Sequence, residues 1–143
     1  MEHNQNDYNQ RLIEEFRADR SNNGDAFKGR PLLLLTTTGA KSGQRRTTPM
    51  MYVRDGERLL VIASNAGAPK HPGWYYNLVA HPQVTVEVGR ETFEATSIVT
   101  EGAERQQLWD KIVEQYSFFA DHQAKVTRSI PVVALERRDN LSF

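Results

Sequence analysis

Apolar residues recur at helical spacing in three stretches of this chain. The first stretch, residues 7–20, carries on one face Tyr8, Leu12, Ile13 and Phe16. This spacing predicts a helix, which the turn-forming segment "SNNGD" ends. The second is the short segment "GWYYNLVA", where Pro72 suits the first turn. The third follows Thr100, the expected N-cap, and "YSFFADHQ" ends or irregularly extends it. Its buried face is expected to carry Leu108, Ile112, Val113 and Tyr116.

Apolar runs and apolar–polar alternation predict six β-strands. Their expected ranges are 30–36, 48–53, 58–64, 84–88, 91–99 and 129–137. Asp55-Gly56 and Gly89-Arg90 are turn signals that join neighbouring strands in hairpins. Hairpins with peripheral helices predict a mainly β, α+β fold, an antiparallel barrel or curled sheet, and argue against a doubly wound nucleotide fold. We assign residues 1–29 to an N-terminal helix and arm, and residues 30–143 to the barrel domain.

Composition narrows the function class. Lysine plus arginine equals aspartate plus glutamate, 18 each, which argues against a nucleic-acid partner and requires any basic patch to be local. The chain has no cysteine, so thiolate catalysis and cysteine-bound zinc are excluded. Apart from His122, the histidines are His3, His71 and His81. They lack metal-ligand spacing, and we predict no metal site.

The expected location is the cytoplasm. The N-terminal segment "MEHNQNDYNQ" lacks the apolar core of a signal peptide, and the apolar run Leu32 to Leu35 is too short to cross a bilayer. The first helix is expected to dock on the domain. The alternatives are an arm over an active site and peripheral contact with the inner face of the cell membrane, which its mixed charges do not favour.

The segment "TTTGAKSGQRRTTP", residues 36–49, is the first candidate site. Gly39 and Gly43 permit backbone conformations that other residues resist. The cations and hydroxyls of this segment come from Lys41, Ser42, Arg45, Arg46, Thr47 and Thr48. Such a set suits a phosphate or carboxylates held by charge-assisted hydrogen bonds. The alternative is a solvated basic loop.

The segment "ASNAGAPKHPGWYYN", residues 63–77, is the second candidate. Its small residues are Ala63, Ser64, Ala66, Gly67 and Ala68. They allow a flat ligand to lie against the backbone, while Trp74 and Tyr75 offer aromatic surface and Lys70 adds a cation. The alternative is that the aromatic residues belong to the core.

A third candidate lies in "EQYSFFADHQ", where Tyr116 and His122 stand among aromatic residues. Histidine titrates near physiological pH and serves as a general acid in many enzymes. The alternative for His122 is an ordinary surface residue.

In these loops the sequence resembles the deazaflavin-dependent nitroreductase and quinone reductase family, which uses the reduced deazaflavin coenzyme F-420. The matching segments are "TTTGAKSGQRRTTPMMY", "VIASNAGAPKHPGWYYNLVAHPQVTVEV" and "TRSIPVVALER". Together they cover roughly residues 31–137. The resemblance implies a split β-barrel related to small FMN-binding oxidases, with residues 30–143 as the deazaflavin-binding domain.

The resemblance also implies roles for residues. Lys41 and Arg46 would hold the phosphate and oligoglutamate tail of the coenzyme. Near them would lie Ser42, Gly43, Arg45 and Thr48. The deazaflavin ring would be lined by Ala63, Ser64, Asn65, Ala66, Pro49, Met50, Trp74 and Tyr75. This chain has Ala40 where the family usually has arginine.

The expected reaction is hydride transfer from reduced F-420 to a small-molecule acceptor: a quinone, a conjugated enone or lactone, or a nitroaromatic. Phe119 and His122 stand at positions where nitro-reducing relatives carry tyrosine, which disfavours nitro reduction. Ser64 or Tyr116 is expected to donate a hydrogen bond to the substrate oxygen, and Tyr116, His122 or water to supply the proton. The alternatives are an FMN-dependent oxidoreductase of the same barrel class and a non-catalytic flavin or quinone carrier. The oligomeric state is left open.

Overall fold

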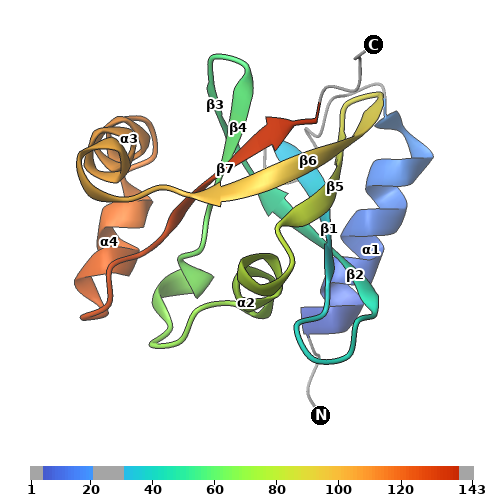
Figure 1. Cartoon of the computed structure of the whole chain (residues 1–143), viewed down its shortest axis with the longest axis horizontal. Coiled ribbons are helices and arrows are strands. Elements are labelled where there is room, and N and C mark those ends of the chain that lie inside the picture. Colours follow the sequence, from blue (N-terminus) through green and yellow to red (C-terminus); the bar gives the residue numbers. More distant parts are fainter. Residues whose placement is uncertain (1–4, 21–30, 139–143) are drawn as a thin grey trace.

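Seven strands and four α-helices make up the part of the chain that the computed structural model describes, residues 5–20 and 31–138 (Figure 1). The helices are α1 (Gln5–Ala18), α2 (Gly73–Ala80), α3 (Gly102–Gln115) and α4 (Phe118–Ala124). The strands are β1 (Leu32–Thr38), β2 (Arg45–Met51), β3 (Val53–Asp55), β4 (Arg58–Ile62), β5 (Gln83–Val88), β6 (Glu91–Val99) and β7 (Val132–Arg137). The expected helix stop "SNNGD" and the C-terminal tail lie outside the described residues.

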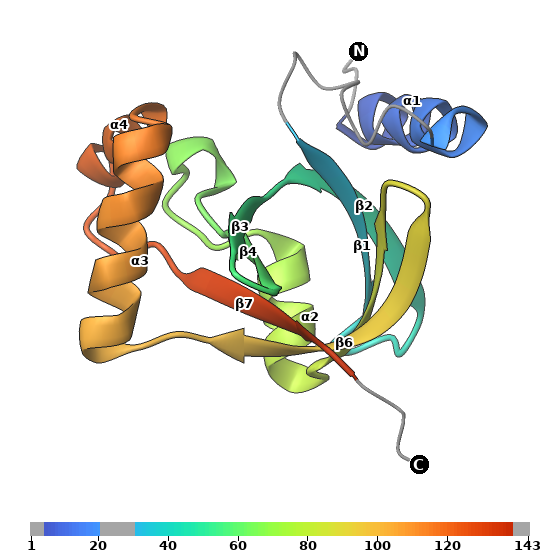
Figure 2. The ribbon, with the colours of Figure 1, turned by 90° about the horizontal axis from the view of Figure 1, so that it is seen from above.

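All neighbouring strands pair antiparallel in one curled sheet with the order β2-β1-β5-β6-β7-β4-β3. The two edge strands, β2 and β3, are consecutive in the chain, with Tyr52 alone between them. Two residue steps span at most roughly 7 Å, so the two edges of the sheet meet and the strands form a ring (Figure 2). The expected antiparallel barrel is confirmed.

Strand β2 begins earlier than the sequence pattern predicts. It starts at Arg45 rather than Thr48, and Arg45 pairs with Thr38 of β1. Farther along, the hydroxyl groups of Thr36 and Thr47 lie 2.8 Å apart across the two strands. Threonine is β-branched and favours a strand, so the threonines and arginines extend the hairpin. The connecting loop shrinks to residues 39–44.

The four-leucine run of β1 is buried on both faces. Leu33 and Leu35 point into the barrel, where they join the interior cluster. Leu32 and Leu34 point outwards and pack under α1 against Ile13 and Phe16. The first helix is therefore docked on the domain, as the sequence predicts.

Helices α3 and α4 cover the outer face of β4 and β7, at the opposite side of the barrel from α1 (Figure 1). Thr100 is not the N-cap of α3, contrary to the prediction. Its hydroxyl donates to the carbonyl of Val132 at 2.8 Å, and it is buried. This bond joins the end of β6 to the start of β7, and Glu101 precedes the helix without a side-chain cap.

Helix α2 closes one end of the barrel (Figure 2). Leu78 is part of the interior cluster, and Trp74 and Tyr75 pack against it. Among the described helices none is both long enough and apolar enough to cross a membrane.

Candidate functional site

The loop between β1 and β2 is a tight structure held by its own backbone. The N–H of Gly39 donates to the carbonyl of Gln44 at 2.8 Å, and the N–H of Gly43 donates to the carbonyl of Gly39 at 3.0 Å. The Ser42 hydroxyl accepts from the N–H of Gln44 at 3.1 Å. Gly43 has φ +72°, which glycine adopts without strain. The loop thus keeps a fixed shape and presents its side chains outwards.

Helix α2 supports this loop through one side chain. The Asn77 side-chain oxygen accepts from the N–H of Ala40 at 3.0 Å, and its amide nitrogen donates to the Thr37 hydroxyl at 3.1 Å. Both the loop and the end of β1 are therefore tied to the middle of α2.

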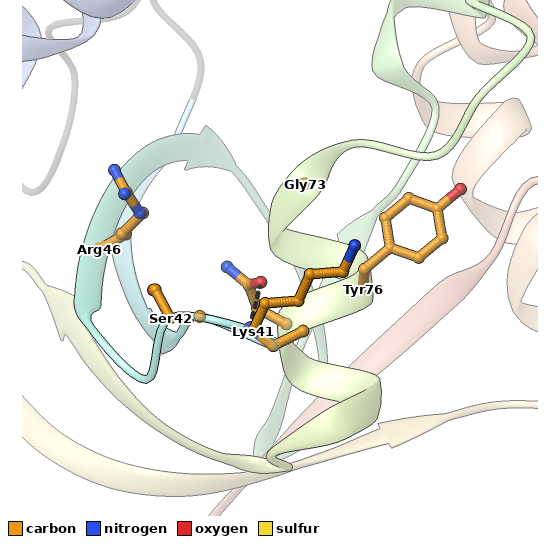
Figure 3. A pocket seen from close by; sticks show the side chains of 8 residues that line it. Lys41, Ser42, Arg46, Gly73 and Tyr76 are labelled. Carbon is orange, nitrogen blue, oxygen red and sulfur yellow. Dashed lines mark hydrogen bonds between the residues drawn. The ribbon is translucent and has the colours of Figure 1, made fainter.

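A pocket of about 660 Å³ lies between the loop and α2 (Figure 3). We call it the cationic pocket; it is lined by Gly39, Ala40, Lys41, Ser42, Arg46, Gly73, Tyr76 and Asn77. Lys41 and Arg46 are exposed, and within residues 5–20 and 31–138 neither has a carboxylate partner. Two unpaired cations beside a pocket suit a ligand that carries acidic groups.

Arg45 points away from this pocket. Successive side chains of a strand alternate between its two faces. The side chains of Arg45 and Arg46 therefore lie on opposite faces of β2. Its guanidinium donates to the hydroxyls of Thr38 at 3.0 Å and Thr85 at 2.6 Å. Of the two adjacent arginines, only Arg46 lines the pocket.

The loop after β4 has an unusual backbone. Asn65, Ala66 and Gly67 have φ values of 50°, 54° and 82°. For Ala66 a left-handed conformation costs about 1 kcal/mol. The N–H of Gly67 donates to the Ser64 carbonyl at 2.9 Å, which closes a turn. The loop sits against α4, and a side chain at Gly67 would meet Lys125 at 2.9 Å.

A second pocket of about 440 Å³ adjoins the first. We call it the central pocket; its walls include Asn9, Thr48, Pro49, Asn65, His71, Pro72 and Trp74. Arg46, Gly73 and Asn77 line both pockets. The two pockets therefore form one groove that runs from the loop at Lys41 to the loop at Asn65.

The groove contains about half of the residues singled out by sequence. Those that line it are Lys41, Ser42, Arg46, Thr48, Pro49, Asn65 and Trp74. Those that do not are Gly43, Arg45, Met50, Ala63, Ser64, Ala66, Lys70 and Tyr75. Met50 and Tyr75 pack against the interior cluster, and Ala63 is fully buried. Lys70 is exposed, and its carbonyl accepts a bond from the Asn65 amide at 3.0 Å.

The proposed proton-handling residues lie behind the Asn65 loop. Nδ1 of His122 is 3.1 Å from the Ser64 hydroxyl, and Ser64 is buried. Burial, with Lys125 nearby, lowers the pKa of His122. Tyr116 is half-buried and contacts the ring of Phe118, with 6.1 Å between centroids. Ser64 and His122 are thus a linked pair, and the ring of Phe118, 5.6 Å from that of His122, lies between His122 and Tyr116.

Six residues of this region were not predicted as site residues: Asn9, His71, Gly73, Tyr76, Asn77 and Arg128. Gly73, Tyr76 and Asn77 stand at positions i, i+3 and i+4 of a helix, which places them on one face. That spacing was a usable signal. Within the described residues no group of three or more metal-ligating side chains is found.

Comparisons with known proteins agree on one family. A family model described as F420H(2)-dependent quinone reductase matches residues 10–137. The F420H(2)-dependent quinone reductase of Mycobacterium tuberculosis is 42% identical over 111 residues, 76% of this chain and 74% of that protein.

Two solved structures are similar to this chain. One described as an F420-H2 dependent reductase is 44% identical, with a TM-score of 0.68, and the match covers 75% of this chain and 95% of that chain. Another, described as a domain-swapped dimer, is 36% identical, with a TM-score of 0.70, and the match covers 93% of this chain and all of that chain (100%).

Proposed function

This chain belongs to the F420H(2)-dependent quinone reductase family, and from that premise we propose that its groove binds reduced F-420 and a small electron-poor acceptor, a quinone in the first place. The observation that carries this proposal is the continuity of the groove. It joins Lys41 and Arg46, which have no carboxylate partner among the described residues, to a slot beside Trp74 and Pro49.

Lys41 and Arg46 fit the acidic end of such a coenzyme. Each is exposed at the cationic pocket without a carboxylate partner in the described ranges. Arginine binds phosphate and carboxylate groups through two parallel hydrogen bonds, and lysine acts as a point charge. We propose that these two residues bind the phosphate and the acidic tail, and that Ser42 and Thr48 add hydroxyl donors.

The central pocket fits the flat ring. Trp74 and Pro49 provide flat apolar walls. In the backbone turn at Asn65, the next two residues are Ala66 and Gly67, whose side chains are small. When bound, the reduced coenzyme supplies a hydride to the acceptor. The task of these residues is to hold ring and acceptor in contact and to exclude water from between them.

Negative charge on the acceptor oxygen requires a hydrogen-bond donor and, in the end, a proton. Ser64 does not itself line the groove, but it directly precedes Asn65, which does. We propose that the Ser64 hydroxyl turns from His122 to donate to the acceptor oxygen, and that His122 or Tyr116 supplies the proton. Conjugated enones and lactones present a similarly polarised carbon, and we propose them as secondary acceptors. Nitroaromatics form the third class, disfavoured by Phe119 and His122.

The test is a titration of the purified protein with reduced F-420 and, separately, with FMN. The expected result is that addition of menadione oxidises the reduced coenzyme, so that the visible absorbance of oxidised F-420 appears. Binding of F-420 without turnover of any acceptor would favour the carrier alternative. Tight binding of FMN with no binding of F-420 would favour the flavin oxidoreductase of the same barrel class.

A further inference from the structure

Arg128, in the segment between α4 and β7, holds the loop that follows β4. Its Nη1 donates to the carbonyl of Ala63 at 3.2 Å, and its Nη2 donates to the carbonyls of Ser64 at 3.0 Å and Ala68 at 3.1 Å. One guanidinium thus binds three carbonyls of the turn. A fourth contact leads out of the loop: Nη1 lies 2.9 Å from Nδ1 of His71.

That fourth contact fixes the tautomer of His71. A guanidinium has hydrogen-bond donors only and stays protonated, so Nδ1 must accept. The proton of the neutral imidazole must then be on Nε2. Burial and the charge of Arg128 also lower the pKa of His71, which keeps the ring neutral at pH 7.

The Nε2–H of His71 is available to a ligand. Nε2 lies on the opposite side of the ring from Nδ1 and has no hydrogen-bond partner in the described part of the chain. His71 is half-buried and lines the central pocket. Its ring is held in place by Tyr75 and Tyr76, with centroids at 4.4 and 5.6 Å.

We propose that His71 donates a hydrogen bond from Nε2 to a ring carbonyl oxygen bound in the central pocket, and that Arg128 is the positioning residue that fixes its tautomer. This inference rests on the proposed function. The oxygen belongs either to the coenzyme ring or to the acceptor, both of which are conjugated carbonyl compounds. A neutral imidazole in this role stabilises negative charge on that oxygen without supplying the proton.

Two substitutions of His71 distinguish the hydrogen bond that Nε2 would donate from the packing contacts of the side chain. In His71→Asn the amide oxygen replaces Nδ1 as the acceptor for Arg128, but the side chain is too short to place an N–H where Nε2 stands. In His71→Gln the amide nitrogen stands near the position of Nε2. We expect about a tenfold loss for Asn, and recovery of most of that loss for Gln, with similar unfolding temperatures for the two variants.

The readouts distinguish the two sources of the oxygen. If the loss in His71→Asn is in the F-420 dissociation constant, the oxygen belongs to the coenzyme. If it is in kcat/KM for menadione at unchanged coenzyme affinity, the oxygen belongs to the acceptor. Equal losses in the Asn and Gln variants, or no loss in Asn, would overturn the proposal.

The tautomer is tested without coenzyme, by nitrogen NMR of the ¹⁵N-histidine-labelled protein. The expected spectrum has a protonated Nε2 and an unprotonated Nδ1 for His71. Arg128→Lys keeps the positive charge but loses the planar set of guanidinium N–H donors, and it is expected to give a mixture of tautomers. A protonated Nδ1 in the wild type would overturn the inference alone. A wild-type protein that binds no F-420 would overturn the proposed function and this inference with it.

Discussion

The side chain of Asn77 on α2 accepts a 3.0 Å hydrogen bond from the backbone N–H of Ala40, in the loop between β1 and β2. The same amide donates to the Thr37 hydroxyl at 3.1 Å. The other bonds of this loop run within residues 39–44 or to the strands beside it. Asn77 therefore fixes the distance between the two walls of the cationic pocket.

Asn77→Ala removes that link and is expected to weaken F-420 binding about fivefold, because the loop at Lys41 loses its support. Asn77→Asp keeps an acceptor for Ala40 but adds a negative charge to the pocket, so its loss should be larger at low salt than at high salt. Fluorescence titration at two salt concentrations measures both. Gln83→Ala, an exposed change on β5, is the control. Unchanged affinity in Asn77→Ala would contradict the supporting role.

Arg46→Ala and Arg45→Ala test the two faces of β2. Arg46 lines both pockets, whereas Arg45 is bound to Thr38 and Thr85 on the other face. Loss of a charge-assisted bond costs about 2 kcal/mol, so Arg46→Ala should raise the F-420 dissociation constant about 30-fold. The effect should shrink with added salt. Arg45→Ala should leave the constant within about twofold. Equal losses would show that the face of the strand does not matter.

The fold was largely readable because its periodic signals are strong. The alternation of Val84, Val86 and Val88 and the helical spacing around Leu108 and Ile112 were interpreted correctly. Neither β3 nor α4 was predicted as a separate element, and the other errors are at boundaries, where local preferences compete. Strand β2 starts three residues early because β1 pairs with it as far as Arg45, and the strand preference of the threonines supports that pairing.

The charged residues of the candidate site could be predicted from the sequence, but the residues that hold its loops in place could not. Lys41 and Arg46 stood out by composition, and the groove brings both to its lining. Arg128 gave no signal, because it lies about sixty residues from the turn whose carbonyls it binds. Ser64 also differs from its expected position: its hydroxyl contacts His122 instead of lining the groove. Contacts between distant segments are set by tertiary packing, which local sequence patterns do not encode.

Gly67 is expected to be the more sensitive of two positive-φ glycines. Gly43→Ala imposes a left-handed conformation on alanine in open space, at a cost of about 1 kcal/mol. Gly67→Ala adds a close contact of 2.9 Å with the Lys125 side chain and van der Waals contacts of 3.4 Å with the backbone of α4, which limit how far the loop can shift to relieve it. Its free energy of unfolding should therefore fall further, by about 2 kcal/mol in total. Denaturant unfolding measures both, and a smaller loss at Gly67 than at Gly43 would contradict the packing of the loop on α4.

The depressed pKa of His122 predicts a pH dependence of stability. Burial, with Lys125 nearby, lowers this pKa below its ordinary value of 6.5, so the unfolded chain binds the proton more readily than the folded protein. The free energy of unfolding should thus be constant well above pH 6.5 and fall as the pH drops below it. His71 adds to the fall in the same direction. His122→Gln should have a shallower slope in this window than the wild type, measured by denaturant unfolding at several pH values. A steeper slope in His122→Gln than in the wild type would contradict a lowered pKa for His122 in the folded protein.

Glu87 on β5 is expected to fix α1 to the barrel. Its side chain is 11% exposed and accepts two bonds from Arg17, at 3.1 and 2.6 Å, while Arg20 approaches to 3.5 Å. Glu87→Ala leaves Arg17 without this partner and should lower the free energy of unfolding by about 2 kcal/mol, less than for a fully buried pair because Arg17 is half exposed. Hydrogen exchange of the α1 amides should accelerate.

The control for this change is Glu91→Ala, which breaks a pair with Arg137 whose side chains are both more than half exposed (62% and 54%). Such surface pairs contribute less than about 1 kcal/mol, so stability and α1 exchange should hardly change. Because Asn9 of α1 lines the central pocket, a loosened helix also moves one wall of the groove. Glu87→Ala should therefore raise KM for menadione about threefold by weakening packing at that wall, while Glu91→Ala leaves it unchanged. Equal exchange rates for α1 in the two variants would mean that the apolar contacts of Ile13 and Phe16 alone hold the helix.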